Sequence, residues 1–178
     1  MNHRTGRLDL EINQDPQQQG GFLVVMRGQI DERADLVRAV DGLSGRVIID
    51  LAGVTFINSI GVREWIKMLR ALEARRVPAT LRRSSETMVM QMNMIIETQT
   101  NAQVESFFAP YLCDACGYEG SVCIEVKDHV RALAAKAPPS LPCPECRAPM
   151  QFNEIPGRYL LFLEQPALGA PPKTAGAK

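Results

Sequence analysis

Apolar positions along residues 1–108 follow two periodicities, one typical of strands and one typical of helices. Leu8, Leu10 and Ile12 alternate with polar neighbours, which favours a half-buried strand. A continuous apolar run at 47–49 favours a buried central strand that ends at Asp50-Leu51. The pattern as a whole predicts five strands, over residues 7–13, 22–26, 46–51, 78–82 and 103–112.

Three helices are expected between these strands. Asp31 can cap the first, which carries apolar residues at helical spacing as far as Leu43. The second runs from about Ser59 to Arg75, and the third spans 86–96. This order predicts an α/β domain over residues 1–108, in which a mixed sheet is covered by helices mainly on one face.

The third helix contains an unusual series of methionines. Helical geometry places Met88 and Met92 on one stripe and Met90 and Met94 on another, so they cannot all face one core. Part of the series is therefore expected on the surface, where flexible thioethers suit self-association or a partner helix. The alternative is that all four fill the core and an adjacent packing seam. Trp65 is expected in the core.

Two Cys-x-x-Cys pairs, separated by 26 residues, supply the strongest chemical signal. Four thiolates in this grouping form a tetrahedral cage for Zn²⁺, so the pairs predict a structural zinc ribbon over residues 109–164. The expected ligands are Cys113, Cys116, Cys143 and Cys146. A redox pair or disulfides are the alternatives, but a thioredoxin-like motif needs only one such pair, at a helix start in a βαβ setting.

The rest of this ribbon is expected to be mostly strand, over 118–126, 150–154 and 158–164, with a helical insertion at 127–136. The fifth cysteine, Cys123, is expected as a free thiol in a buried strand, and His129 as a solvated helix residue. Residues 165–178 are rich in Pro, Ala, Gly and Lys, which predicts a disordered tail.

Charge is balanced over the chain, with 20 basic and 20 acidic residues. Each sign contributes 13 residues over 1–108 and seven over 109–178, so neither part carries the basic surface that nucleic-acid binding needs. No apolar run is long enough for a membrane span, and thiolate ligands favour a reducing compartment, so a cytoplasmic protein is expected. No catalytic constellation is evident, which predicts a protein that is not an enzyme.

Two short motifs resemble those of one family. The segment 46–63, Arg-Val-Ile-Ile-Asp-Leu-Ala-Gly-Val-Thr-Phe-Ile-Asn-Ser-Ile-Gly-Val-Arg, is similar to the STAS signature of a buried strand, a short turn and a helix start. Gly28-Gln-Ile-Asp31 is similar to the turn that enters the first helix of that family. The resemblance covers roughly residues 7 to 108 and implies the fold of anti-sigma-factor antagonists.

The resemblance also implies roles for individual residues. Ser59 matches the phosphorylated serine of STAS regulators, whereas Asn58 replaces the usual Asp and Ile60 replaces a second Ser or Thr. A helix start suits this role, because its free N–H groups attract anions and a phosphate changes the surface that a partner contacts. The residues expected to contact a partner are Asp31, Asn58, Ile60, Gly61 and Arg63. The simpler alternative is that Asn58 or Ser59 only caps the helix.

These features together predict a non-enzymatic regulatory module of the partner-switching type, joined to a structural zinc site. The resemblance implies a bacterial protein whose partner is an anti-sigma factor or a serine kinase. Two alternatives stay open: an accessory subunit that docks on a larger assembly, and a nucleic-acid-associated zinc-ribbon protein. A homo-oligomer is also compatible with the sequence.

Overall fold

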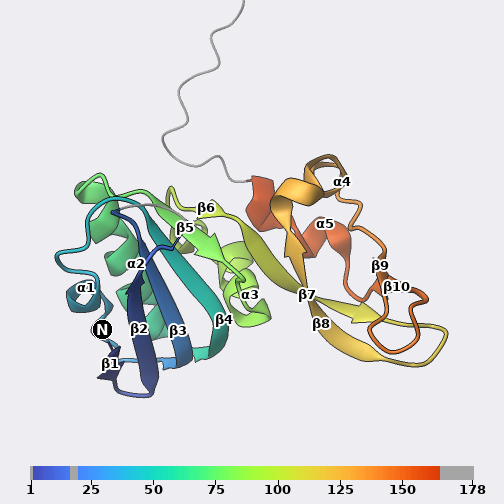
Figure 1. The fold of residues 1–178 in the computed structure, drawn as a ribbon, viewed down its shortest axis with the longest axis horizontal. Coiled ribbons are helices and arrows are strands. Elements are labelled where there is room, and N and C mark those ends of the chain that lie inside the picture. Colours follow the sequence, from blue (N-terminus) through green and yellow to red (C-terminus); the bar gives the residue numbers. More distant parts are fainter. Residues whose placement is uncertain (1, 17–19, 165–178) are drawn as a thin grey trace, which may run out of the picture.

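The computed structural model describes residues 2–16 and 20–164, which form two β-sheets connected by a continuous chain (Figure 1). The tail expected over 165–178 lies outside the described residues, as does the centre of the glutamine-rich turn at 17–19.

The first sheet has six strands in the order of the chain. They are β1 (Asn2–Thr5), β2 (Leu8–Gln14), β3 (Phe22–Ile30), β4 (Val47–Ile57), β5 (Ala79–Arg82) and β6 (Gln103–Val104). β1, β2 and β3 pair antiparallel, whereas β3 to β6 pair parallel. The predicted mixed sheet is therefore confirmed.

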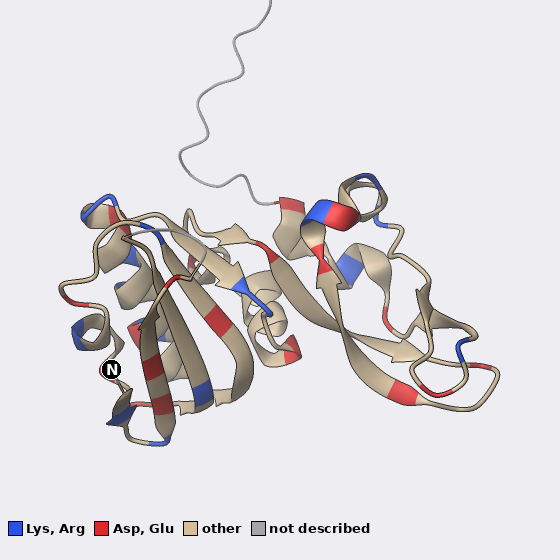
Figure 2. Ribbon diagram, viewed as in Figure 1, with Lys and Arg blue, Asp and Glu red and all other residues tan. Residues whose placement is uncertain are grey.

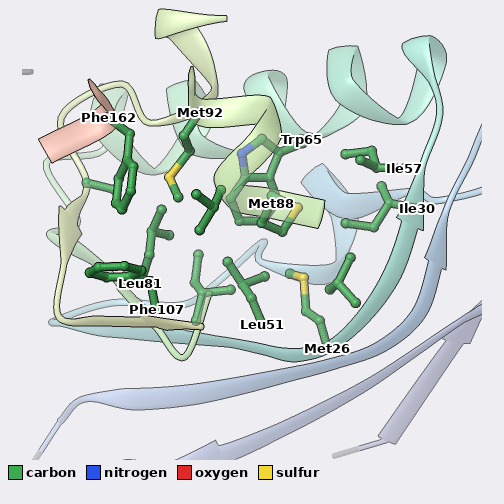
Figure 3. Packing of buried hydrophobic residues seen from close by; sticks show 14 of the residues in the cluster. Met26, Ile30, Leu51, Ile57, Trp65, Leu81, Met88, Met92, Phe107 and Phe162 are labelled. Atoms are coloured by element: carbon green, nitrogen blue, oxygen red, sulfur yellow. The ribbon is translucent and has the colours of Figure 1, made fainter. Parts of the chain in front are cut away.

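Helices cover one face of this sheet, as predicted. They are α1 (Leu36–Ala39), α2 (Ser59–Ala74), α3 (Glu86–Met94) and the short 3-10 helix η1 (Ile96–Thr98). Figure 3 shows sheet residues such as Met26 and Leu51 facing Trp65 and Met88 from the helices. Trp65 is fully buried, and its indole N–H donates to the carbonyl of Thr98 at 2.6 Å, so the prediction of a core tryptophan is confirmed.

The second sheet is antiparallel and four-stranded, in the order β8-β7-β10-β9. Its strands are β7 (Ser106–Leu112), β8 (Glu119–Glu125), β9 (Leu141–Pro142) and β10 (Pro149–Phe152). Short helices complete it: η2 (Val126–Asp128), α4 (Val130–Ala134), α5 (Pro156–Tyr159) and η3 (Leu161–Glu164). The chain passes from the first sheet to the second at Glu105, between β6 and β7, and the boundary expected after residue 108 falls within β7.

One hydrophobic core extends through both sheets. Phe162 of η3 is fully buried and packs edge-on against Phe107 of β7, with ring centroids 5.1 Å apart. Figure 3 shows the Phe162 ring beside Met92 of α3 and the Phe107 ring beside Leu81 of β5. The Tyr159 hydroxyl of α5 donates to the carbonyl of Phe108 at 2.8 Å. The second sheet is therefore packed onto the first part of the chain.

The methionines of α3 occupy two stripes, as predicted from their spacing. Met88 and Met92 are fully buried, whereas Met90 and Met94 are 56% and 63% exposed. The alternative in which all four fill the core is wrong.

Several predicted elements differ from the structure. The single strand expected over 103–112 is two strands, β6 and β7, which belong to different sheets, and β1 was not predicted. The helix expected to start at Asp31 spans only α1, and Asp35 caps it by accepting the N–H of Arg38 at 3.3 Å. Asp31 instead accepts the N–H of Arg33 at 2.9 Å, a local turn that competes with helix formation. The strand expected to end at Leu51 continues to Ile57, because β3 runs parallel to β4 as far as Ile30.

The strand expected over 158–164 is helical instead, as α5 and η3. Tyr159, Leu160 and Phe162 are buried and Leu161 is 42% exposed, a spacing that fits a helical turn rather than alternation. Pro156 occupies the first helical position, where its missing N–H costs nothing.

Candidate functional sites

The start of α2 is capped by Asn58. Its side-chain oxygen accepts the N–H groups of Ile60 and Gly61 at 3.1 and 2.7 Å, which satisfies two donors that have no partner inside the helix. Its amide nitrogen donates to the carboxylate of Glu32 at 3.0 Å. The pKa of Glu32 is lowered by a hydrogen bond from its own backbone N–H and by the one from Asn58. Capping therefore belongs to Asn58 and not to Ser59.

Gly61 allows α2 to approach the end of β3 closely. A Cβ atom at this position would lie 2.0 Å from the carbonyl oxygen of Ile30, which also accepts the backbone N–H of Asn58 at 3.2 Å. No side chain fits in that space, so Gly61 determines how the loop between β4 and α2 sits against the sheet.

The first turn of α2 presents three different groups to solvent. Ser59 is exposed, and its hydroxyl forms no hydrogen bond with any described residue. Ile60 is 41% exposed, and the side chain of Arg63, one turn further on, has no hydrogen bond or ion pair within residues 2–16 and 20–164. A free hydroxyl, an apolar side chain and an unpaired cation thus lie within five consecutive residues.

Asp31 lies beside this turn but is only 7% exposed. It lines a shallow hollow of about 200 Å³ that reaches Asn58. The residues around the hollow are Arg7, Gln29, Asp31, Glu32, Arg33, Phe56 and Asn58. Sequence reasoning missed Glu32 and the half-exposed Phe56; their only signal was their position next to Asp31 and close to Asn58 in the chain.

The four cysteines of the two pairs converge between β7–β8 and β9–β10. Their sulfur atoms all lie within 4.8 Å of one another, with Cys113 3.5 Å from Cys146 and Cys116 3.6 Å from Cys143. Sulfurs held at the usual Zn–S length of about 2.3 Å in a tetrahedron are about 3.8 Å apart, whereas a disulfide needs about 2.05 Å. The cluster therefore fits a metal ion.

The two pairs share one backbone conformation. In the first pair, the N–H of Gly117 donates to the backbone carbonyl of Cys113, and the N–H of Cys113 donates to the backbone carbonyl of Tyr118, both at 2.8 Å. The second pair repeats this pattern: the N–H of Arg147 donates to the carbonyl of Cys143, and the N–H of Cys143 donates to the carbonyl of Ala148. The residue after each second cysteine is left-handed, with φ of 74° at Gly117 and 66° at Arg147. Two equivalent loops thus direct their sulfurs to one point.

The sulfurs are crowded enough to oppose joint ionisation. Burial disfavours the Cys113 thiolate, but the N–H groups of Cys116 and Ala115, together with the sulfurs of Cys146 and Cys116, lower the pKa of Cys113 to about 7. The N–H of Tyr118 favours the Cys116 thiolate, yet burial and the neighbouring sulfurs raise the pKa of Cys116 to about 12. Four thiolates at this spacing need a cation to balance their charge.

Cys123 and His129, whose side chains could in principle bind a metal, lie outside the cluster. Cys123 is half-buried in β8, and burial raises the pKa of its thiol. His129 directly precedes α4 and is not one of the grouped ligands.

No helix within the described part of the chain is long and apolar enough to cross a membrane.

No family model and no curated protein matches this chain. A solved structure of the anti-sigma factor antagonist SpoIIAA in its unphosphorylated form is similar to part of it, at 20% identity and a TM-score of 0.32. The match covers 41% of this chain and 71% of SpoIIAA. A likeness this partial supports no inference about function.

Proposed function

We propose that this protein is a non-enzymatic regulatory module that binds a protein partner through the start of α2, and that phosphorylation of Ser59 controls this binding. The observation that supports this proposal is that Asn58, and not Ser59, caps the helix. The exposed Ser59 hydroxyl therefore contributes nothing to the cap and is accessible for modification. The motif similarity to STAS regulators at residues 28–31 and 46–63 is consistent with this role.

Arg63 adds an electrostatic reason. It lies one turn after Ser59 on the same stripe of α2 and has no acidic partner among the described residues. A phosphate on Ser59 brings a charge of about −1.5 to −2 and three acceptor oxygens, which the free guanidinium can bind. Phosphorylation would then convert a cationic, partly apolar surface at Ile60 and Arg63 into an anionic one without refolding the domain.

The proposed partner is an anti-sigma factor or a serine kinase, in line with the motif similarity. The test uses the chain isolated from its native cells, with peptide mapping of Ser59 and identification of stoichiometric partners. Ser59→Ala is expected to keep the partner and Ser59→Glu to lose it, with Ser121→Glu on the exposed surface of β8 as a matched added charge. Equal binding by both Ser59 variants would contradict the switch. A stoichiometric complex with unmodified Ser59 would instead support an accessory docking subunit.

We also propose that the cysteine cluster holds one structural Zn²⁺. A set of four thiolates selects Zn²⁺ or an iron–sulfur cluster, and the single tetrahedral group of sulfurs suits one zinc ion. All four positions would be filled by protein, which leaves none for water or substrate. Metal analysis of the purified chain is expected to give one zinc per molecule.

A further inference from the structure

The outer face of α3 is apolar and uncovered. Met90 and Met94 are 56% and 63% exposed, and Ile96, just beyond the helix, is 65% exposed. The opposite face of the same helix is fully buried in the core. Three large apolar side chains exposed within seven residues are unusual for a free surface, and thioethers adapt readily to an opposing surface.

The ends of this face are acidic. No Lys or Arg occurs in residues 84–104, whereas Glu86 precedes the exposed methionines and Glu97 follows them. Neither glutamate forms an ion pair within the described part of the chain. Figure 2 shows acidic but no basic colouring on α3. An occupant of this face should therefore be basic at positions that flank its contact with the methionines.

The outer face of α2 has the opposite character. Residues 59–76 include five basic and two acidic residues, and Arg63, Lys67 and Arg70 recur at helical spacing. Lys67 pairs with Glu64 at 2.7 Å, but Arg63 and Arg70 have no ion pair among the described residues. The alkyl stems of such side chains can cover apolar groups while their charged ends reach acids. Ile60 adds exposed apolar area at the start of the same helix.

We propose that α3 of one molecule docks on α2 of a second copy of this chain. Unpaired cations on α2 then face unpaired glutamates at both ends of α3, and Met90 and Met94 pack against Ile60 and the alkyl stems of α2. Pairing of α3 with another α3 would instead bring the acidic ends of two copies together, which like-charge repulsion disfavours. The contact shares Ile60 and Arg63 with the surface of the proposed switch, but it requires no modification of Ser59, so it can be tested on the unmodified chain.

The test is sedimentation velocity of the full zinc-loaded chain over a concentration series, at low and at high salt. Wild type is expected to associate reversibly, and more weakly at high salt because part of the attraction is ionic. An α3 variant (M90Q/M94Q) and an α2 variant (R63E/R70E) should each weaken association by roughly tenfold or more, since both contacts are central to the interface. The control K127E/R131E makes the same change in charge on exposed residues of η2 and α4 and should associate like wild type.

Mixing the two variants identifies the pairing. The α2 variant retains an intact α3, and the α3 variant retains an intact α2, so a one-to-one mixture can form one complete α2–α3 contact. Association is expected to be stronger in the mixture than in either variant alone. A monomeric wild type, an unaffected α2 variant, or a mixture that stays monomeric after both variants have lost association would each overturn the proposal.

Discussion

The side chain of Asn93, on α3, holds the backbone of the segment that contains Phe162. Its oxygen accepts the N–H of Phe162 at 2.9 Å, and its amide donates to the carbonyl of Tyr159 at 2.8 Å. Tyr159 and Phe162 follow Asn93 in the chain by 66 and 69 positions, so both bonds are long-range contacts. They connect the part of the chain that carries the cysteine cluster to a helix that covers the first sheet, so the two parts should unfold together.

Replacing Asn93 with alanine is expected to destabilise the protein by about 1–3 kcal/mol, because the partly buried carbonyl of Tyr159 and N–H of Phe162 would lose their partner. Urea unfolding followed by the fluorescence of Trp65, the single tryptophan, measures this change. Gln91→Ala on the same helix is the control, because its side chain makes none of these contacts. If Asn93→Ala loses no more stability than Gln91→Ala, the two hydrogen bonds of the Asn93 side chain contribute no stability.

Phe162→Ala should cost more, about 3–5 kcal/mol, because it leaves a cavity in a fully buried position against Phe107. Leu161→Ala removes a neighbouring apolar side chain that is 42% exposed and should cost much less. Chemical denaturation of both variants compares the two positions directly. Similar losses would mean that η3 does not contribute to the shared core.

Removing the proposed metal is expected to affect the environment of Trp65, although this residue belongs to the first part of the chain. The cysteine cluster lies between the β7–β8 and β9–β10 connections, and β7 continues into the core through Phe107. Chelation or Cys143→Ser should therefore lower the unfolding midpoint reported by Trp65 fluorescence, because metal binding contributes to folding free energy. Cys123→Ser, which changes a thiol outside the cluster, controls for loss of a sulfur. A midpoint unmoved by chelation would show that the two parts fold independently.

Local features were predictable from the sequence. The Cys-x-x-Cys spacing identified the four grouped sulfurs, and the spacing of methionines identified which of them are exposed. Periodicity also identified the mixed sheet and the helices that cover it.

Features that depend on distant contacts were not predictable. The apolar run at 159–163 fits a strand as well as a helix, and only its packing against Asn93 and Phe107 decides between them.

Competing local hydrogen bonds set a second limit. The Asp31 carboxylate can cap a helix or form a turn with Arg33, and sequence alone does not rank the two. For the same reason, sequence left open whether Asn58 or Ser59 caps α2.

Gly61→Ala should destabilise the protein although alanine favours helices. Its Cβ would lie 2.0 Å from the carbonyl oxygen of Ile30, so α2 must move away from β3, at an expected cost of about 1–3 kcal/mol. Gly157→Ala is a matched control, because a Cβ in α5 at that position meets nothing within 4 Å. Thermal unfolding of both variants provides the measurement. Equal or greater stability of Gly61→Ala would mean that the close approach is easily relaxed.

Asn58→Ala tests which residue caps α2. The change leaves the N–H groups of Ile60 and Gly61 without their acceptor and should cost about 0.5–2 kcal/mol. Ser59→Ala should be close to neutral by comparison, because the exposed hydroxyl makes no bond with a described residue. Urea unfolding of the two single variants and the double variant distinguishes the roles, and their effects should add if Ser59 takes no part in the cap. A larger loss in Ser59→Ala than in Asn58→Ala would assign the cap to the serine and remove the structural reason for treating its hydroxyl as free to be phosphorylated.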